Sequence, residues 1–125
     1  MKQIETAHAP AAVGPYTQAI EANGILYTSG QIPLDPRSGR IDAEGIEAQT
    51  AQAIRNLAAV LEAAGSSLEK VVKTTCFLRS MDDFAAFNAV YAECFPGKPA
   101  RSCVAAAALP KGALVEIEAI AEVGD

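Results

Sequence analysis

The sequence has little of what several classes of site require. Its 125 residues include no tryptophan, one histidine and three cysteines. The cysteines, Cys76, Cys94 and Cys103, are an odd set without a Cys-x-x-Cys pair, so they form neither a disulfide framework nor a zinc-binding pattern. With His8 as the one histidine, a zinc ion would lack ligands. We therefore expect no metal site.

Basic residues and long apolar runs are also scarce. Ten basic residues stand against fifteen acidic ones, a net charge of −5, so a nucleic-acid partner is not expected. The longest apolar stretches, such as Val104 to Leu109, are far shorter than the roughly 20 residues that span a bilayer. The segment from Met1 to Glu5 does not resemble the start of a signal peptide. We expect a cytoplasmic protein without a membrane partner.

The chain length suits one domain, residues 1–125, and the residue patterns predict an α+β fold. Apolar residues at spacings of three and four predict a helix over about 45–64, ended by Gly65. The capping sequence Ser80–Asp83 predicts a second helix with the stripe Phe84, Phe87, Val90, Tyr91 and Cys94. Strands are expected over residues 2–6, 16–21, 25–30, 70–79, 101–109 and 114–122, with an Asn23-Gly24 hairpin turn between the second and third.

The predicted order is strand, strand, strand, helix, strand, helix, strand, strand. Two helices with one apolar stripe each can cover only one face of a six-stranded sheet. The strand that contains Val104–Ala108 is apolar on both sides of its pleat, so the uncovered face is expected to be hydrophobic. Such a face normally marks a subunit interface, and we expect a homo-oligomer.

Two polar positions in the last strands are candidates for chemistry. Alternation puts Arg101 and Cys103 on one face of their strand, where the arginine either pairs with a surface carboxylate or clamps a small anionic ligand. Glu116 and Glu118 share a face of the final strand, where they either form its solvated side or place one carboxylate in a cleft as a base for water.

Other catalytic arrangements find less support in the sequence. A Cys103–His8 pair lacks a third group to orient the imidazole. The segment Thr28–Gln31 follows a strand, but no helix begins there to bind a phosphate. No nucleotide cofactor is therefore expected.

Several segments together resemble the RidA family, the YjgF-like reactive-intermediate deaminases. The segments are Pro10–Tyr16, Thr28–Pro33, Lys73–Thr75, Asp83–Phe84 with Asn88, Pro99–Leu109 and Val115–Ile117. Their order and spacing extend the resemblance over nearly the whole chain.

The resemblance implies a chorismate mutase-like fold, a single mixed sheet with two helices on one face, assembled as a homotrimer with clefts between subunits. It implies hydrolysis of 2-imino or 2-enamino acids, such as 2-aminoacrylate and 2-iminobutanoate, to 2-oxo acids and ammonia, without cofactor or metal. In the same way, Arg101 would hold the substrate carboxylate, the Cys103 backbone would bond near the imine nitrogen, and Glu116 would activate water. The cleft would also be lined by Tyr16, Ser29, Gly30 and Asn88.

The sequence departs from archetypal members in the small side chains of Ala105–Ala108 and in the short loop Pro96–Lys98, both expected to border the cleft and to affect substrate size. Two other hypotheses stay open. One is a non-catalytic or regulatory protein that binds small carboxylates in the same clefts. The other is a ribonuclease or translation inhibitor, which the acidic balance disfavours.

Overall fold

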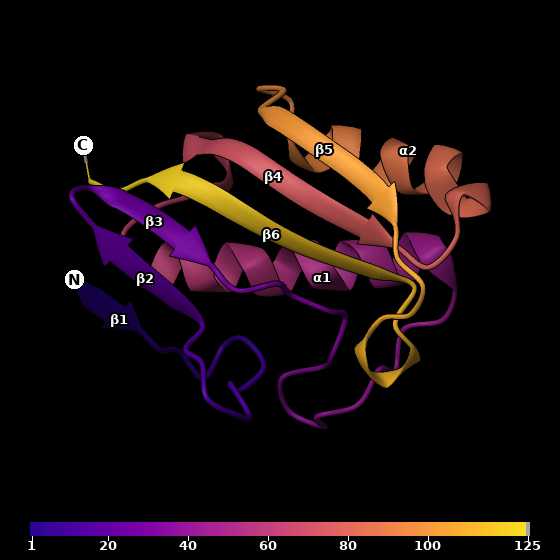
Figure 1. The fold of residues 1–125 in the computed structure, drawn as a ribbon, viewed down its shortest axis with the longest axis horizontal. Helices are drawn as coiled ribbons and strands as arrows, with labels where there is room; N and C mark the ends of the chain where they lie inside the picture. Colours follow the sequence, from indigo (N-terminus) through magenta and orange to yellow (C-terminus); the bar gives the residue numbers. More distant parts are fainter. Residues whose placement is uncertain (125) are drawn as a thin grey trace.

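Six strands form one mixed sheet with both α-helices on the same side (Figure 1). This computed structural model describes residues 1–124. The strands are β1 (Lys2–Ile4), β2 (Ala19–Ala22), β3 (Ile25–Thr28), β4 (Val71–Leu78), β5 (Ala100–Ala105) and β6 (Val115–Glu122). The helices are α1 (Gly45–Ala63) and α2 (Phe84–Cys94), with 3₁₀ turns at Leu68–Lys70, Met81–Asp83 and Pro110–Gly112. The predicted order of six strands and two helices is confirmed.

The strands lie side by side in the order β1-β2-β3-β6-β4-β5. The pair β4 and β5 is parallel and every other pair is antiparallel. A parallel pair needs a crossover connection, and α2 supplies it between β4 and β5. The C-terminal strand β6 inserts between β3 and β4, so β5 is left at an edge of the sheet.

The core lies between the sheet and α1, the helix that runs behind β3 and β6 in Figure 1. In β6, Val115, Ile117 and Ala119 are buried while the residues between them are partly exposed, as expected for a strand covered on one side. The side of α1 that faces them carries Ile46, Ala53, Ile54, Leu57, Val60 and Leu61, all buried. The predicted apolar stripe of this helix is therefore its buried face.

Three predicted turn signals act much as expected. Asn23 and Gly24, with φ of 54° and 78°, form the β2–β3 hairpin turn. Gly65, with φ of 79°, follows the last turn of α1. Ser80 accepts a hydrogen bond from the Asp82 N–H at 3.1 Å, so it caps the 3₁₀ turn that leads directly into α2, one turn earlier than the α-helix itself.

The side of the sheet without helices carries exposed apolar residues. Tyr27 on β3 and Val104 on β5 are 47% and 48% exposed, and Tyr27 neighbours Ile20 and Ile120 across the ladder. We call this side the open face. The predicted strand over residues 101–109 is shorter in the structure, because the chain leaves the sheet after Ala105.

Candidate active site

Arg101 lies on the helix side of the sheet, near the start of the edge strand β5. It pairs in the ladder with Thr74 of β4, whose side chain is fully buried on that side. Its Nη1 donates a hydrogen bond to Oδ1 of Asn88 on α2 at 2.6 Å. Within residues 1–124 the one ion pair closer than 4.0 Å joins Arg40 and Asp42, so no carboxylate neutralises Arg101. A partly buried guanidinium with N–H groups to spare suits a ligand carboxylate.

Cys103 lies two residues further along β5, on the same side as Arg101. It pairs with Cys76 of β4, and burial raises the pKa of both thiols, that of Cys76 to about 12. A thiol with a raised pKa is a poor nucleophile at neutral pH. The environment of Cys103 therefore agrees with a positional role for this residue. We call Asn88, Arg101 and Cys103 the arginine group.

Glu116 of β6 lies on the open face, because its neighbours Val115 and Ile117 point to the helix side. Its carboxyl group is about half buried, and this burial, followed by the negative charge of Glu118, raises its pKa. Gly30 lies directly against it: a Cβ atom at Gly30 would overlap Oε2 and stand 2.8 Å from Cδ. Only glycine leaves room for this carboxylate, which has the raised pKa that suits a general base.

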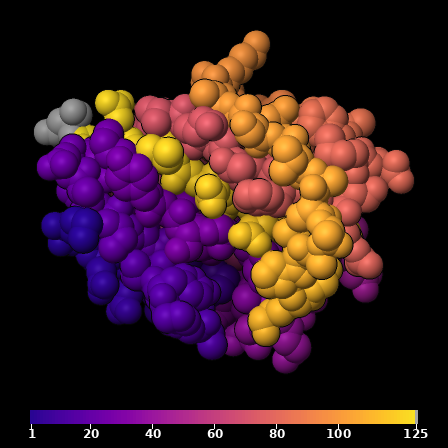
Figure 2. All heavy atoms as spheres, in the orientation of Figure 1, coloured from indigo at the N-terminus to yellow at the C-terminus, as the bar shows by residue number. Residues whose placement is uncertain are grey.

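Tyr16, Ser29, Gly30 and Glu116 line one hollow of about 660 Å³. Figure 2, drawn from the same side as Figure 1, shows it between the indigo and purple N-terminal segment and the orange-yellow loop after β5. The other lining residues are mostly apolar, with two amides and one basic residue: Pro10, Ala11, Val13, Gln18, Gln31, Ile32, Leu34, Pro110 and Lys111. We call the four predicted residues in this hollow the glutamate group.

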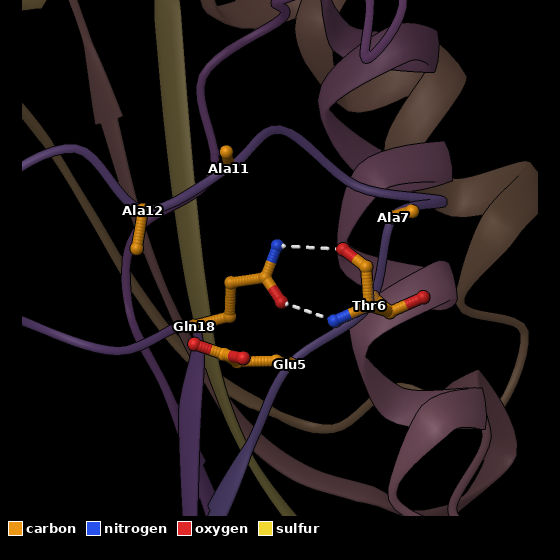
Figure 3. Close-up of a pocket in the computed structure, with 6 residues that line it drawn as sticks. All are labelled: Glu5, Thr6, Ala7, Ala11, Ala12 and Gln18. Atoms are coloured by element: carbon orange, nitrogen blue, oxygen red, sulfur yellow. Dashed lines mark hydrogen bonds between the residues drawn. The ribbon is translucent and has the colours of Figure 1, made fainter.

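Buried amide side chains hold the walls of the hollow in place. Gln18, 3% exposed, accepts a hydrogen bond from the Thr6 N–H at 2.7 Å and donates one to the Pro10 carbonyl at 2.8 Å. Figure 3 shows its side chain between the segment Glu5–Ala7 and the segment Ala11–Ala12. The loop that leads to Tyr16 is therefore folded around one amide.

The opposite wall has a similar support from α1. Asn56, 1% exposed, donates hydrogen bonds to the carbonyls of Ile32 at 3.0 Å and Leu34 at 2.8 Å. Ser29 donates its hydroxyl hydrogen to the Thr17 carbonyl at 2.6 Å. Hydrogen bonds within the chain therefore hold both walls.

The arginine group and the glutamate group do not meet within one chain. Arg101 pairs with Thr74, whereas Glu116 pairs with Phe77, three residues further along the same strand. From the spacing of residues and strands, the Cα atoms of Arg101 and Glu116 are about 14 Å apart. Their side chains also leave opposite sides of the sheet. A ligand of a few atoms cannot contact both in one copy of the chain.

Sequence reasoning missed the supports of both groups. Gln18 and Asn56 were not singled out, since an amide in a loop or on a helix carries no local signal of what it bonds. Phe84, Phe87 and Tyr91 were recognised as an apolar stripe, but not as the wall against which Arg101 lies. That contact depends on the pairing of β5 with β4, which sequence periodicity does not reveal.

The described part of the chain shows neither a metal-binding cluster nor a membrane-spanning helix. Residues 1–124 contain no cluster of three or more histidine, cysteine or acidic side chains placed to bind a metal ion. Over the same residues, no helix has both the length and the hydropathy that crossing a bilayer requires.

Comparison with known proteins identifies the family of the chain. A family model described as Endoribonuclease L-PSP matches residues 6–123. The chain belongs to this family, the YjgF/RidA family. The expected membership is confirmed, and every residue of the arginine and glutamate groups falls within the matched range.

Individual relatives of this RidA-family chain carry different names. A protein of Lactococcus lactis, named as a regulator, AldR, is 53% identical over 98% of both chains. The 2-iminobutanoate/2-iminopropanoate deaminase of Salmonella typhimurium is 48% identical over 96% of both chains. The crystal structure of E. coli TdcF with bound serine has a TM-score of 0.94 and 41% identity, and the match covers 99% of this chain and 100% of that one. The shared fold is therefore established across relatives whose names differ.

Proposed function

We propose that this RidA-family protein is a hydrolytic deaminase that converts 2-imino acids, and the 2-enamino acids that tautomerise to them, to 2-oxo acids and ammonia. The observation that carries the proposal is Arg101. It is a guanidinium that has no carboxylate partner among residues 1–124 and lies on an edge strand, as the binding of a small carboxylic acid requires. The deaminase name of a relative that is 48% identical supports the same reaction.

Each residue then has a role in one balanced reaction. Arg101 binds the substrate carboxylate through two parallel hydrogen bonds, and the Cys103 backbone bonds near the imine nitrogen. Glu116 accepts a proton from water as the water oxygen adds to the C=N carbon. Glu116 then returns this proton to the nitrogen of the carbinolamine, and ammonia leaves as the hydroxyl group loses its proton to the carboxylate and the C=O bond forms. A protonated imine is already electrophilic, so positioning of the water and the carboxylate supplies much of the acceleration.

The proposed site is shared between copies of the chain, as a homotrimer with clefts between subunits. One copy supplies the arginine group and its neighbour supplies the glutamate group. Two observations support this arrangement: the two groups lie on opposite sides of the sheet, and the open face carries exposed apolar residues such as Tyr27 and Val104.

The first experiment measures conversion of freshly generated 2-aminoacrylate to pyruvate, with 2-iminobutanoate and bulkier imino acids for comparison. The wild-type protein is expected to exceed the buffer rate, and Arg101→Ala and Glu116→Gln to lose most of that excess. A wild-type rate equal to the buffer rate would overturn the proposal.

A complementation experiment tests whether the site is shared. Arg101→Ala and Glu116→Gln chains are co-expressed with different tags, and the mixed oligomers are purified through both tags. In a mixed trimer one of the three clefts receives both intact groups, so activity should recover to about one third of the wild-type value. Inactive mixed oligomers would contradict a site built from two copies.

A second candidate function is regulation by binding a small carboxylic acid without turnover. The regulator's name carried by the relative that is 53% identical favours it. Binding of 2-oxobutyrate that depends on Arg101, together with no turnover of any imino acid, would select this function instead. Cleavage of RNA that disappears in identically purified Arg101→Ala protein would instead support a ribonuclease.

A further inference from the structure

Four side chains on one face of α2 lie around Arg101. Phe84, Phe87, Asn88 and Tyr91 follow the spacing i, i+3, i+4 and i+7, which places them along one side of the helix. The Cζ atom of Arg101 lies 5.6 Å, 6.0 Å and 4.9 Å from the ring centroids of Phe84, Phe87 and Tyr91. All three distances are within the range of a cation–π interaction, and Tyr91 is the nearest ring.

Tyr91 is itself fixed from two directions. Its hydroxyl group lies 2.7 Å from Oγ1 of Thr74, the fully buried residue that pairs with Arg101 in the sheet. Its ring stacks on Phe95, with the centroids 4.5 Å apart. Tyr91 as a whole is only 7% exposed, and its ring therefore has little freedom to turn away from the guanidinium.

Contact with aromatic rings leaves the N–H donors and the charge of an arginine free, whereas an ion pair does not. A carboxylate partner would occupy the N–H groups and neutralise the charge, whereas a ring face attracts the cation without accepting its hydrogen bonds. Asn88 accepts one hydrogen bond from Nη1, and it is the one acceptor of the Arg101 guanidinium among residues 1–124. Most of the five N–H donors of the guanidinium therefore remain available to a ligand carboxylate.

We infer that Tyr91 is a positioning residue for carboxylate binding: its ring, anchored by Thr74, holds the Arg101 guanidinium in place while leaving its donors free. The inference rests on the proposed function only in taking Arg101 as the group that binds the ligand carboxylate. The ring and the hydroxyl group of Tyr91 have different roles. The ring supports the guanidinium, and the hydroxyl group supports the ring.

The test separates these two parts. Tyr91→Phe keeps the ring but removes its hydrogen bond to the buried Thr74 hydroxyl, which retains only the weaker contact with the Cys76 thiol, whereas Tyr91→Leu removes the ring as well. The probe is 2-oxobutyrate, titrated by calorimetry, with its neutral amide, 2-oxobutanamide, as the ligand that lacks the charge. Thermal unfolding is measured for each variant, and kcat and KM are measured with 2-iminobutanoate.

Tyr91→Leu is expected to weaken 2-oxobutyrate binding and to raise KM about fivefold, which corresponds to about 1 kcal/mol of lost cation–π interaction. Its kcat should change less than about twofold, since the reacting atoms are not touched, and its affinity for the amide should be unchanged. Tyr91→Phe should lower the Tm but keep 2-oxobutyrate affinity within about twofold, because the ring remains. Stability and binding would thus respond to different atoms of one residue.

Equal loss of 2-oxobutyrate affinity in Tyr91→Phe and Tyr91→Leu would overturn the inference, as would equal loss for the acid and the amide. If Tyr91→Leu does not fold, Phe84→Leu replaces it. Phe84 is only partly buried, and its removal should weaken 2-oxobutyrate binding about twofold while leaving amide binding unchanged; no change for the acid would then overturn the inference. Absent turnover with intact, ring-dependent binding would refute the proposed deaminase but support this role of Tyr91.

Discussion

Replacing Gly30 by alanine places a single methyl group against the Glu116 carboxylate. The new carbon would overlap Oε2, and would lie 2.8 Å from Cδ and 3.0 Å from Cγ. Non-bonded carbon atoms are comfortable at about 3.5–4.0 Å, so the carboxylate must move by on the order of 1 Å. Gly30 is not one of the glycines with positive φ, so its backbone permits alanine, and the partly exposed Glu116 side chain can rotate into the hollow that it lines.

The expected consequence is a folded protein with a misplaced base. A displacement of about 1 Å in a positioning group costs on the order of a hundredfold in rate, or about 2.7 kcal/mol of transition-state stabilisation. We therefore expect kcat/KM for 2-iminobutanoate to fall about a hundredfold in Gly30→Ala. The Tm should fall by no more than about 5 °C, since the strain falls on a mobile side chain.

A double-mutant cycle identifies the cause of the loss. If the methyl group acts by displacing Glu116, Gly30→Ala should have almost no further effect in a Glu116→Gln protein, whose base is already absent. If it acts by blocking the substrate directly, the two losses should multiply. Wild-type activity in Gly30→Ala, or fully additive losses, would refute the reasoning about this close approach.

Three further predictions concern charge and support. Burial raises the pKa of Glu116, so the folded protein holds the carboxyl proton to higher pH than the unfolded chain does, and the ionised carboxylate destabilises the fold. Glu116→Gln should therefore raise the Tm at pH 7. This gain should disappear near pH 3, where Glu116 is protonated in both states, and calorimetry at the two pH values checks it. Glu118→Gln removes a like charge and should move the acid limb of the kcat/KM profile to lower pH; an unmoved limb would mean that Glu116 is not the titrating base. Asn56→Ala removes the donor to the Leu34 carbonyl and one of the two donors to the Ile32 carbonyl, which also accepts from the Leu34 N–H, at a cost of about 1–3 kcal/mol; an unchanged midpoint in urea unfolding would contradict this.

Much of the fold follows from local patterns in the sequence. The helical spacing of Ile46, Ile54, Leu57 and Leu61 reflects a helix covered on one side, so α1 was predictable almost to the residue. The alternation in β6 and the Asn23-Gly24 turn are equally local. The residues at which strands end were less predictable, because contacts between distant parts of the chain set them. The strand β5 stops at Ala105 because its partner β4 ends at Leu78, although the alanine run continues to Ala108.

The residue types of the site were also recognisable from the sequence, through the spacing of Arg101, Cys103 and Glu116 and their resemblance to a family pattern. What the sequence by itself determined was therefore which side chains are present and which strands carry them. Only the tertiary structure decided that β5 pairs with β4 and β6 lies on the other side of β4. That pairing sends Arg101 to the aromatic face of α2 and Glu116 to the open face. Strand periodicity sets the alternation along each strand, but the order of strands across a sheet depends on contacts between residues far apart in the chain.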